Sequence, residues 1–122
     1  MLAEGNYNAQ IINAEPKTSK AGNEMIEVKM NIDHDGESTH VWDYAVFHID
    51  WKMDDIKSSI GLSSEDDVTV ETLMGKWIQV EIIHEEWNGK EKAKVKKWIG
   101  VGEAPLTGND NNDEENDIDY VV

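Results

Sequence analysis

Apolar and polar side chains alternate without interruption from residue 26 to residue 33, within a predicted strand over residues 24–33, and this alternation restricts the fold more than any other feature. A period of two is the period of a β-strand, in which successive side chains point to opposite faces. The predicted buried face consists of Ile26, Val28, Met30 and Ile32. Since the residues between them are mostly polar, the segment is predicted to be a strand with one face in the core and one face outward.

Four more segments have strand composition, and two glycine-containing turns connect neighbours. His34-Asp35-Gly36 is predicted to be a hairpin turn, and Asn88-Gly89 is the preferred dipeptide of a two-residue type I′ hairpin. The five predicted strands span residues 6–14, 24–33, 37–49, 77–87 and 90–99. A short helix is predicted over 51–60, ended by Gly61, and a further helical turn within 65–74, ended by Gly75.

Three strands, a helix and a final hairpin are the element order of an OB-fold barrel. We therefore predict a mainly β protein, a five-stranded OB-fold-like antiparallel barrel with one short helix between strands three and four. A β-sandwich is disfavoured, because only five strands are visible. The 122-residue length fits one folded domain, predicted over residues 1–107.

The third predicted strand carries two aromatic residues on what is not its core face. Its core face is predicted to contain Val41, Ala45, Phe47 and Ile49, with Asp43 as an interruption. Trp42 and Tyr44 then share the other face with His40 and His48. Met25 and Lys29 are predicted to face outward on the neighbouring strand. Exposed aromatic rings on a sheet can stack on the bases of a single strand; the alternative is that a helix or loop buries both rings.

The final hairpin has lysine at every second position. A two-residue turn at Asn88-Gly89 places Trp87 opposite Lys90 and Ile83 opposite Lys94. The same register predicts the pairs Glu85–Lys92 and Glu81–Lys96. One face then carries Lys90, Lys92, Lys94, Lys96 and Trp98, as in a phosphate track with a stacking ring. The alternative is that Lys92 and Lys96 only form cross-strand ion pairs, which leaves Lys90 and Lys94 as the better phosphate ligands.

The loop over residues 15–23 carries Lys17 and Lys20. In an OB-fold, this first loop and the last hairpin flank the oligonucleotide groove. Basic residues in both segments are therefore predicted to meet the same ligand.

The charge of the chain points in a different direction. The formal net charge is -15, and all basic residues are lysines. Residues 108–122 are predicted to form a disordered acidic tail, because such a segment buries too little apolar surface to fold. The tail ends in Asp117, Ile118, Asp119, Tyr120, Val121 and Val122. This end is predicted to dock on a partner protein; the alternative is that the tail only makes the protein more soluble. The remaining body is still acidic, which favours an alternative function, a DNA mimic or interaction module that binds a basic host protein.

Catalytic and metal chemistry find little support in the sequence. The absence of cysteine excludes disulfides and thiolate metal sites. The four histidines, His34, His40, His48 and His84, lack metal-ligand spacing, so neither a metal nor a cofactor is predicted. An enzyme on a barrel scaffold is the weakest alternative, since no nucleophile is positioned beside a base. No signal peptide and no apolar run of about 20 residues are seen, so a cytoplasmic protein is expected.

Several short motifs resemble those of small bacteriophage single-stranded-DNA-binding proteins. In the first half these are Gly5-x-Tyr7-x-Ala9-x-Ile11, Lys17-Thr-Ser-Lys-Ala-Gly-Asn-Glu-Met25 and Val41-Trp-Asp-Tyr44. In the second half they are Leu73-Met-Gly-Lys76 and Glu85-Glu-Trp-Asn-Gly-Lys90. The resemblance extends over roughly residues 4–100, and the acidic tail is similar to the tails by which other single-strand binders recruit replication partners.

This resemblance implies an OB-fold that binds single-stranded DNA with little sequence preference, in phage replication or recombination in the host cytoplasm. We predict that Lys17, Lys20, Lys29, Lys90 and Lys94 neutralise phosphates. The residues predicted to stack on bases are Trp42, Tyr44 and Trp87. A homo-oligomer is compatible with this prediction, and no membrane partner is expected.

Overall fold

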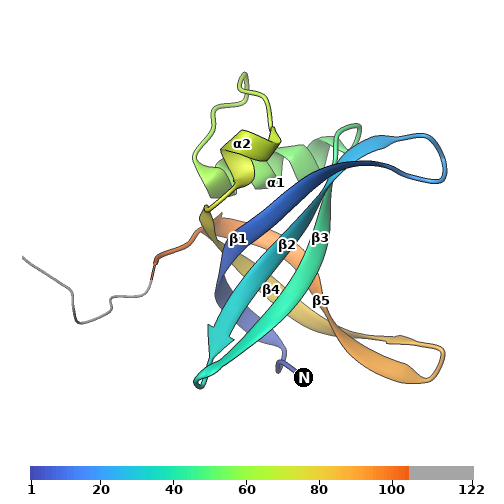
Figure 1. Ribbon diagram of the computed structural model, residues 1–122, viewed down its shortest axis with the longest axis vertical. Coiled ribbons are helices and arrows are strands. Elements are labelled where there is room, and N and C mark those ends of the chain that lie inside the picture. Colours follow the sequence, from blue (N-terminus) through green and yellow to red (C-terminus); the bar gives the residue numbers. More distant parts are fainter. Residues whose placement is uncertain (105–122) are drawn as a thin grey trace, which may run out of the picture.

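The computed structural model describes residues 1–104, in which five strands and two helices follow one another (Figure 1). The strands are β1 (Gly5–Thr18), β2 (Glu24–His34), β3 (Glu37–Val46), β4 (Trp77–Trp87) and β5 (Lys90–Val101), and the helices are α1 (Asp50–Ile60) and α2 (Val70–Leu73). All pairings are antiparallel, in one open sheet of order β3-β2-β1-β4-β5. The prediction of a mainly β chain with five antiparallel strands is confirmed. The predicted tail, including its six named terminal residues, lies outside the described residues.

Two tight turns have the backbone that their sequences predict. Asp35 and Gly36 have φ of 52° and 79°, and Asn88 and Gly89 have φ of 53° and 77°. Positive φ at both central residues is the signature of a type I′ turn, whose twist matches that of the flanking strands. Asn and Asp tolerate this region better than other non-glycine residues, and glycine occupies it without steric cost.

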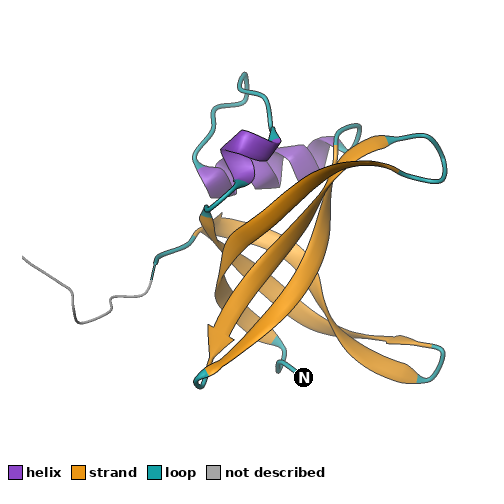
Figure 2. Ribbon diagram, in the orientation of Figure 1, coloured by secondary structure: helices purple, strands orange, loops and turns teal. Residues whose placement is uncertain are grey.

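The core lies on the concave side of the curved sheet, and both helices cover one end of it (Figure 2). The alternating residues of β2 that were predicted to be buried are all buried. Ile56 and Ile60 of α1 and Leu73 of α2 complete the core at the helix-covered end, and Leu2 joins it from the N-terminal segment. No helix within residues 1–104 has the length and hydropathy needed to cross a membrane.

The boundaries of two strands differ from the prediction by three residues or more. β1 continues to Thr18, past Pro16, because its pairing with β2 extends to the base of the turn. β3 ends at Val46, where the chain turns toward α1. Phe47 was predicted to be in the core and is instead 41% exposed, so this prediction was wrong. The turn removes Phe47 from the period-two pattern of β3, so the pattern no longer determines which way its side chain points.

β5 also departs from the predicted register. The pairs Trp87–Lys90, Glu85–Lys92 and Ile83–Lys94 are confirmed. The pairing then shifts, so Glu81 lies opposite Lys97 instead of Lys96. An extra residue in one strand reverses the faces of the residues that follow it. Trp98 is therefore 1% exposed and belongs to the core, which contradicts its predicted place in an exposed row with the lysines.

Candidate functional site

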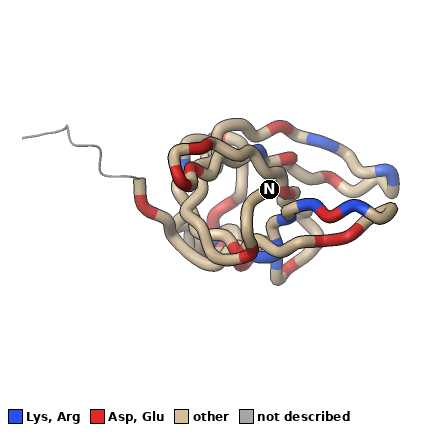
Figure 3. The backbone as a smooth tube through the Cα atoms, turned by 90° about the horizontal axis from the view of Figure 1, so that it is seen from below, with Lys and Arg blue, Asp and Glu red and all other residues tan. Residues whose placement is uncertain are grey.

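Two long hairpins project from the same side of the molecule (Figure 1). The first is formed by β1 and β2, and the second by β4 and β5. Figure 3 shows lysines on both hairpins, with acidic residues between them. The hairpins therefore bring basic residues from distant parts of the sequence to one side of the sheet.

A groove of about 680 Å³ runs between β3 and the beginning of β5. Its lining residues are Met1, Leu2, Thr39, His40, Val41, Trp42, Asp43, Tyr44, Glu85, Trp87, Glu91, Lys92, Ala93, Lys94 and Val95. The carbonyl oxygen of Leu2, which lines the groove, lies 2.7 Å from Nε2 of the His84 ring, and the backbone N–H of His84 donates to the Glu4 carboxylate. These contacts attach the N-terminal segment to β4, so one boundary of the groove is fixed.

Three aromatic side chains of this groove are accessible. Trp42 is 51% exposed, Tyr44 40% and Trp87 73%. Trp42 and Tyr44 lie on the outer face of β3, opposite Lys29 and Glu27 of β2. The alternative that a helix or loop buries the two rings of β3 is therefore excluded.

Neighbouring side chains orient the two rings of β3. The ammonium of Lys29 lies 5.7 Å from the centroid of the Trp42 ring, and the His40 ring meets Trp42 edge-on at 6.5 Å. Such contacts favour one orientation of an exposed indole. The Tyr44 hydroxyl donates to Glu27 at 3.1 Å. This hydrogen bond is the main cause that raises the pKa of Tyr44, and burial adds to the effect.

Two of the predicted phosphate ligands are already paired with carboxylates. Lys94 lies 3.1 Å from Glu85, and Lys17 lies 3.5 Å from Glu27. Glu85 was predicted to pair with Lys92, which does lie opposite it, but the ion pair is the diagonal one with Lys94. Diagonal neighbours are within reach of long side chains. Both pairs are accessible to water, so each contributes at most about 1 kcal/mol and can exchange for a ligand phosphate.

The predicted site residues fall into two groups. Trp42, Tyr44, Trp87 and Lys94 meet around the groove. Lys17, Lys20, Lys29 and Lys90 do not line it. Lys29 nevertheless contacts the ring of Trp42, and Lys90 lies opposite Trp87 at the tip of its hairpin. Lys17 and Lys20 belong to the first hairpin, Lys17 to β1 and Lys20 to the turn before β2.

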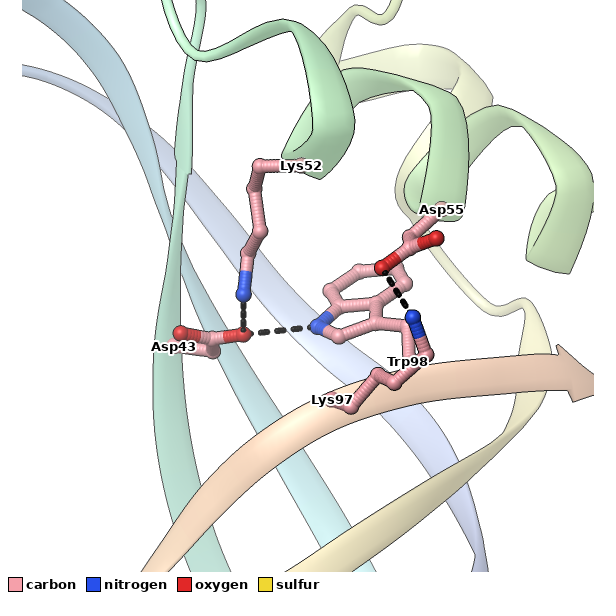
Figure 4. A network of polar contacts seen from close by, with 5 residues as sticks. All are labelled: Asp43, Lys52, Asp55, Lys97 and Trp98. Carbon is pink, nitrogen blue, oxygen red and sulfur yellow. Dashed lines mark hydrogen bonds and ion pairs between the residues drawn. The ribbon is translucent and has the colours of Figure 1, made fainter.

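A buried polar cluster, which the sequence did not predict, lies between β3, α1 and β5 (Figure 4). Oδ2 of Asp43 accepts hydrogen bonds from Nζ of Lys52 and, at 2.7 Å, from Nε1 of Trp98. The side chain of Lys52 is buried, which is rare for a lysine unless it is paired. The available signal was the interruption of an apolar face by Asp43, since a carboxylate on a core face requires partners.

The groove is acidic as well as basic. Asp43, Glu85 and Glu91 line it together with Lys92 and Lys94. Within residues 1–104, no group of three or more histidine and carboxylate side chains is placed to hold a metal ion. The groove therefore offers stacking on exposed rings, together with contacts to single lysines and carboxylates.

One comparison with known proteins identifies a family. Residues 1–103 match the family DUF669, described as "Protein of unknown function". The chain belongs to this family. The match ends one residue before the last described residue, so the DUF669 region and the described structure coincide almost completely. No curated protein matches the chain.

Proposed function

We propose that the protein binds single-stranded DNA, with little sequence preference, in the groove between β3 and β5. The observation that carries this proposal is the convergence of Trp42, Tyr44 and Trp87 with Lys94 around one groove. Bases of any sequence can stack on exposed rings, and a lysine beside them can contact the backbone. A duplex keeps its bases stacked inside and offers no base faces to these rings.

We further propose that the curved sheet is an OB-fold. Its strand order, its helix-covered end and its two projecting hairpins agree with that architecture. The hydrogen bond from Trp98 to Asp43 links the two edge strands, β5 and β3, which supports a sheet curved toward closure. In this fold, a groove flanked by the first loop and the last hairpin is the usual site for an oligonucleotide.

Stacking supplies most of the affinity in this proposal. Each base stacked on an aromatic ring contributes about 1–3 kcal/mol. Lys17 and Lys94 must leave their carboxylates before they can bind phosphate, which reduces their net contribution. Lys20, Lys29 and Lys90 form no ion pair within the described residues and reach the backbone at lower cost.

The resemblance to phage single-strand binders supports a role in replication or recombination of phage DNA in the host cytoplasm. In this role the protein protects exposed strands and catalyses no reaction. The acidic tail, predicted over residues 108–122, would recruit partner proteins through its apolar end.

Tryptophan fluorescence tests the proposal directly. The full chain is titrated with a thymine oligonucleotide of about 30 bases at two salt concentrations, with duplex DNA as the control. We expect quenching by the single strand alone, and a salt slope of about −0.7 for each phosphate neutralised. Absence of any effect at micromolar concentrations of protein and oligonucleotide would refute the proposal.

A second candidate function follows from the carboxylates of the groove. Asp43, Glu85 and Glu91 beside exposed rings also suit a basic protein segment, and the net charge of -15 would attract one. This interaction module would bind a lysine-rich or arginine-rich peptide and ignore oligonucleotides. A competition experiment between such a peptide and the thymine oligonucleotide distinguishes the two candidates.

A further inference from the structure

Trp51 is an exposed indole that none of the functions above uses. It lies in the first turn of α1 and is 59% exposed. It is neither part of the buried core nor among the half-buried residues packed against it. Tryptophan is enriched at binding surfaces, where its large ring supplies contact area to a ligand.

Lys52 connects this indole to the groove. Its ammonium lies 5.8 Å from the centroid of the Trp51 ring and also pairs with the carboxylate of Asp43. Asp43 lines the groove. Trp51 itself does not line the groove, but a single buried ammonium contacts both its ring and the groove-lining Asp43.

The arrangement repeats that of Trp42. There the Lys29 ammonium lies 5.7 Å from the ring, and half of the indole surface is exposed. In both cases a lysine lies over the ring and more than half of the surface remains free. A ring held in place before binding loses less conformational entropy when a base stacks on it.

We infer that Trp51 is a further base-stacking residue, which extends the binding path from the groove onto the beginning of α1. This inference rests on the proposed function of the groove. The ligand is the base of a nucleotide that follows those stacked at Trp42 and Tyr44. A strand too short to pass Asp43 does not reach Trp51.

The charges around Trp51 determine how it contributes. Asp50, on the same turn as Trp51, and Asp54, on the next turn, are exposed. The Lys52 ammonium is neutralised by Asp43. Among the described residues, this turn therefore has no unpaired cation that could bind a phosphate. The contribution of Trp51 comes from stacking alone and does not depend on counterion release.

The test compares Trp51→Ala with wild-type protein over thymine oligonucleotides of about 4 to 16 bases, the range of site sizes for one OB-fold. We expect unchanged affinity for the shortest strand, an affinity about tenfold lower for the longest, and the same salt slope. Trp51→Phe keeps a ring and should restore most of the loss. Met74→Ala, which removes another exposed apolar side chain that does not line the groove, is the matched control.

Different failures have different meanings. Equal affinities of Trp51→Ala and wild type at every length would overturn the inference and leave the proposed function intact. A large fall in the urea midpoint of Trp51→Ala would also overturn it, since the ring would then be structural. If the wild-type protein bound none of the oligonucleotides, the proposed function itself would be refuted, and this inference with it.

Discussion

The buried polar cluster at the helix-covered end and the exposed rings of the groove use alternate residues of the same strand, β3. At the helix-covered end, Asp43 points inward and joins Lys52 and Trp98 in a buried polar cluster. On either side of Asp43 in the sequence, Trp42 and Tyr44 point outward into the groove. Inward residues of β3 thus hold the edge strands and α1 together, while outward residues remain available to a ligand. Stability and binding should therefore respond to different substitutions on one short segment.

The largest effect is expected from Trp98→Ala. This substitution empties a fully buried site and removes a donor to Asp43, so the free energy of unfolding should fall by about 3–5 kcal/mol. Urea unfolding followed by circular dichroism measures the loss. Trp87→Ala is the matched control, because its ring is mostly exposed and its removal should change stability by less than about 0.5 kcal/mol. Equal losses in the two variants would contradict the assignment of Trp98 to the core.

Asp43→Ala should lower the free energy of unfolding by about 3 kcal/mol, because it leaves the buried ammonium of Lys52 without a partner. The same urea experiment measures it. The double variant Asp43→Ala/Lys52→Met removes the unpaired charge and should recover part of the stability. If the double variant were no more stable than Asp43→Ala, the buried charge would not be the source of the loss.

Trp42→Ala should affect binding and leave the fold unchanged. We expect the affinity for a thymine oligonucleotide to fall by about 1–3 kcal/mol, and the free energy of unfolding to change by less than about 0.5 kcal/mol. Tyr44→Ala should behave in the same way. Fluorescence titration and urea unfolding of the same preparation measure the two quantities. Unfolding of either variant would mean that β3 does not divide its residues between stability and binding.

Glu85→Ala and Lys94→Ala should change binding in opposite directions, each by up to about 1 kcal/mol. Removing Glu85 frees Lys94 for phosphate, so affinity should rise and the salt slope should steepen by about 0.7. Removing Lys94 should weaken binding and flatten the slope. Titrations at several salt concentrations measure both effects. A gain of oligonucleotide affinity in Lys94→Ala would contradict the assignment of Lys94 as a phosphate ligand.

The smallest effect concerns Tyr44. Its pKa is raised chiefly by the hydrogen bond to Glu27, so Glu27→Ala should lower the pKa toward the ordinary value of 10.0. A raised pKa in the folded state means that this bond stabilises the protein below pH 10 and that the contribution is lost as pH rises through the raised value. Absorbance titration of the tyrosines detects the change. Tyr44→Phe removes one of the three tyrosine titrations and so identifies the one that belongs to this residue.

The parts of the fold that depend on local rules were predictable. The buried face of β2, the two turns with positive φ and the outward direction of Trp42 all follow from residues adjacent in sequence. The register of the final hairpin was also correct from Trp87 to Ile83, because a two-residue turn determines the pairing next to it. Half of the candidate site, its aromatic residues above all, was therefore accessible to sequence reasoning.

What the sequence by itself determined, then, is the set of strands, the type of the turns and the alternation of faces within each uninterrupted stretch. Only the tertiary structure decided which way Trp98 points, because the bulges of β5 form where the strand bends to follow β4. It also decided the partners of Asp43 and Glu85. Asp43 and Trp98 are 55 residues apart along the chain, so no local periodicity records their contact. Alternation depends on neighbouring residues, whereas a buried hydrogen bond depends on how the whole sheet curves.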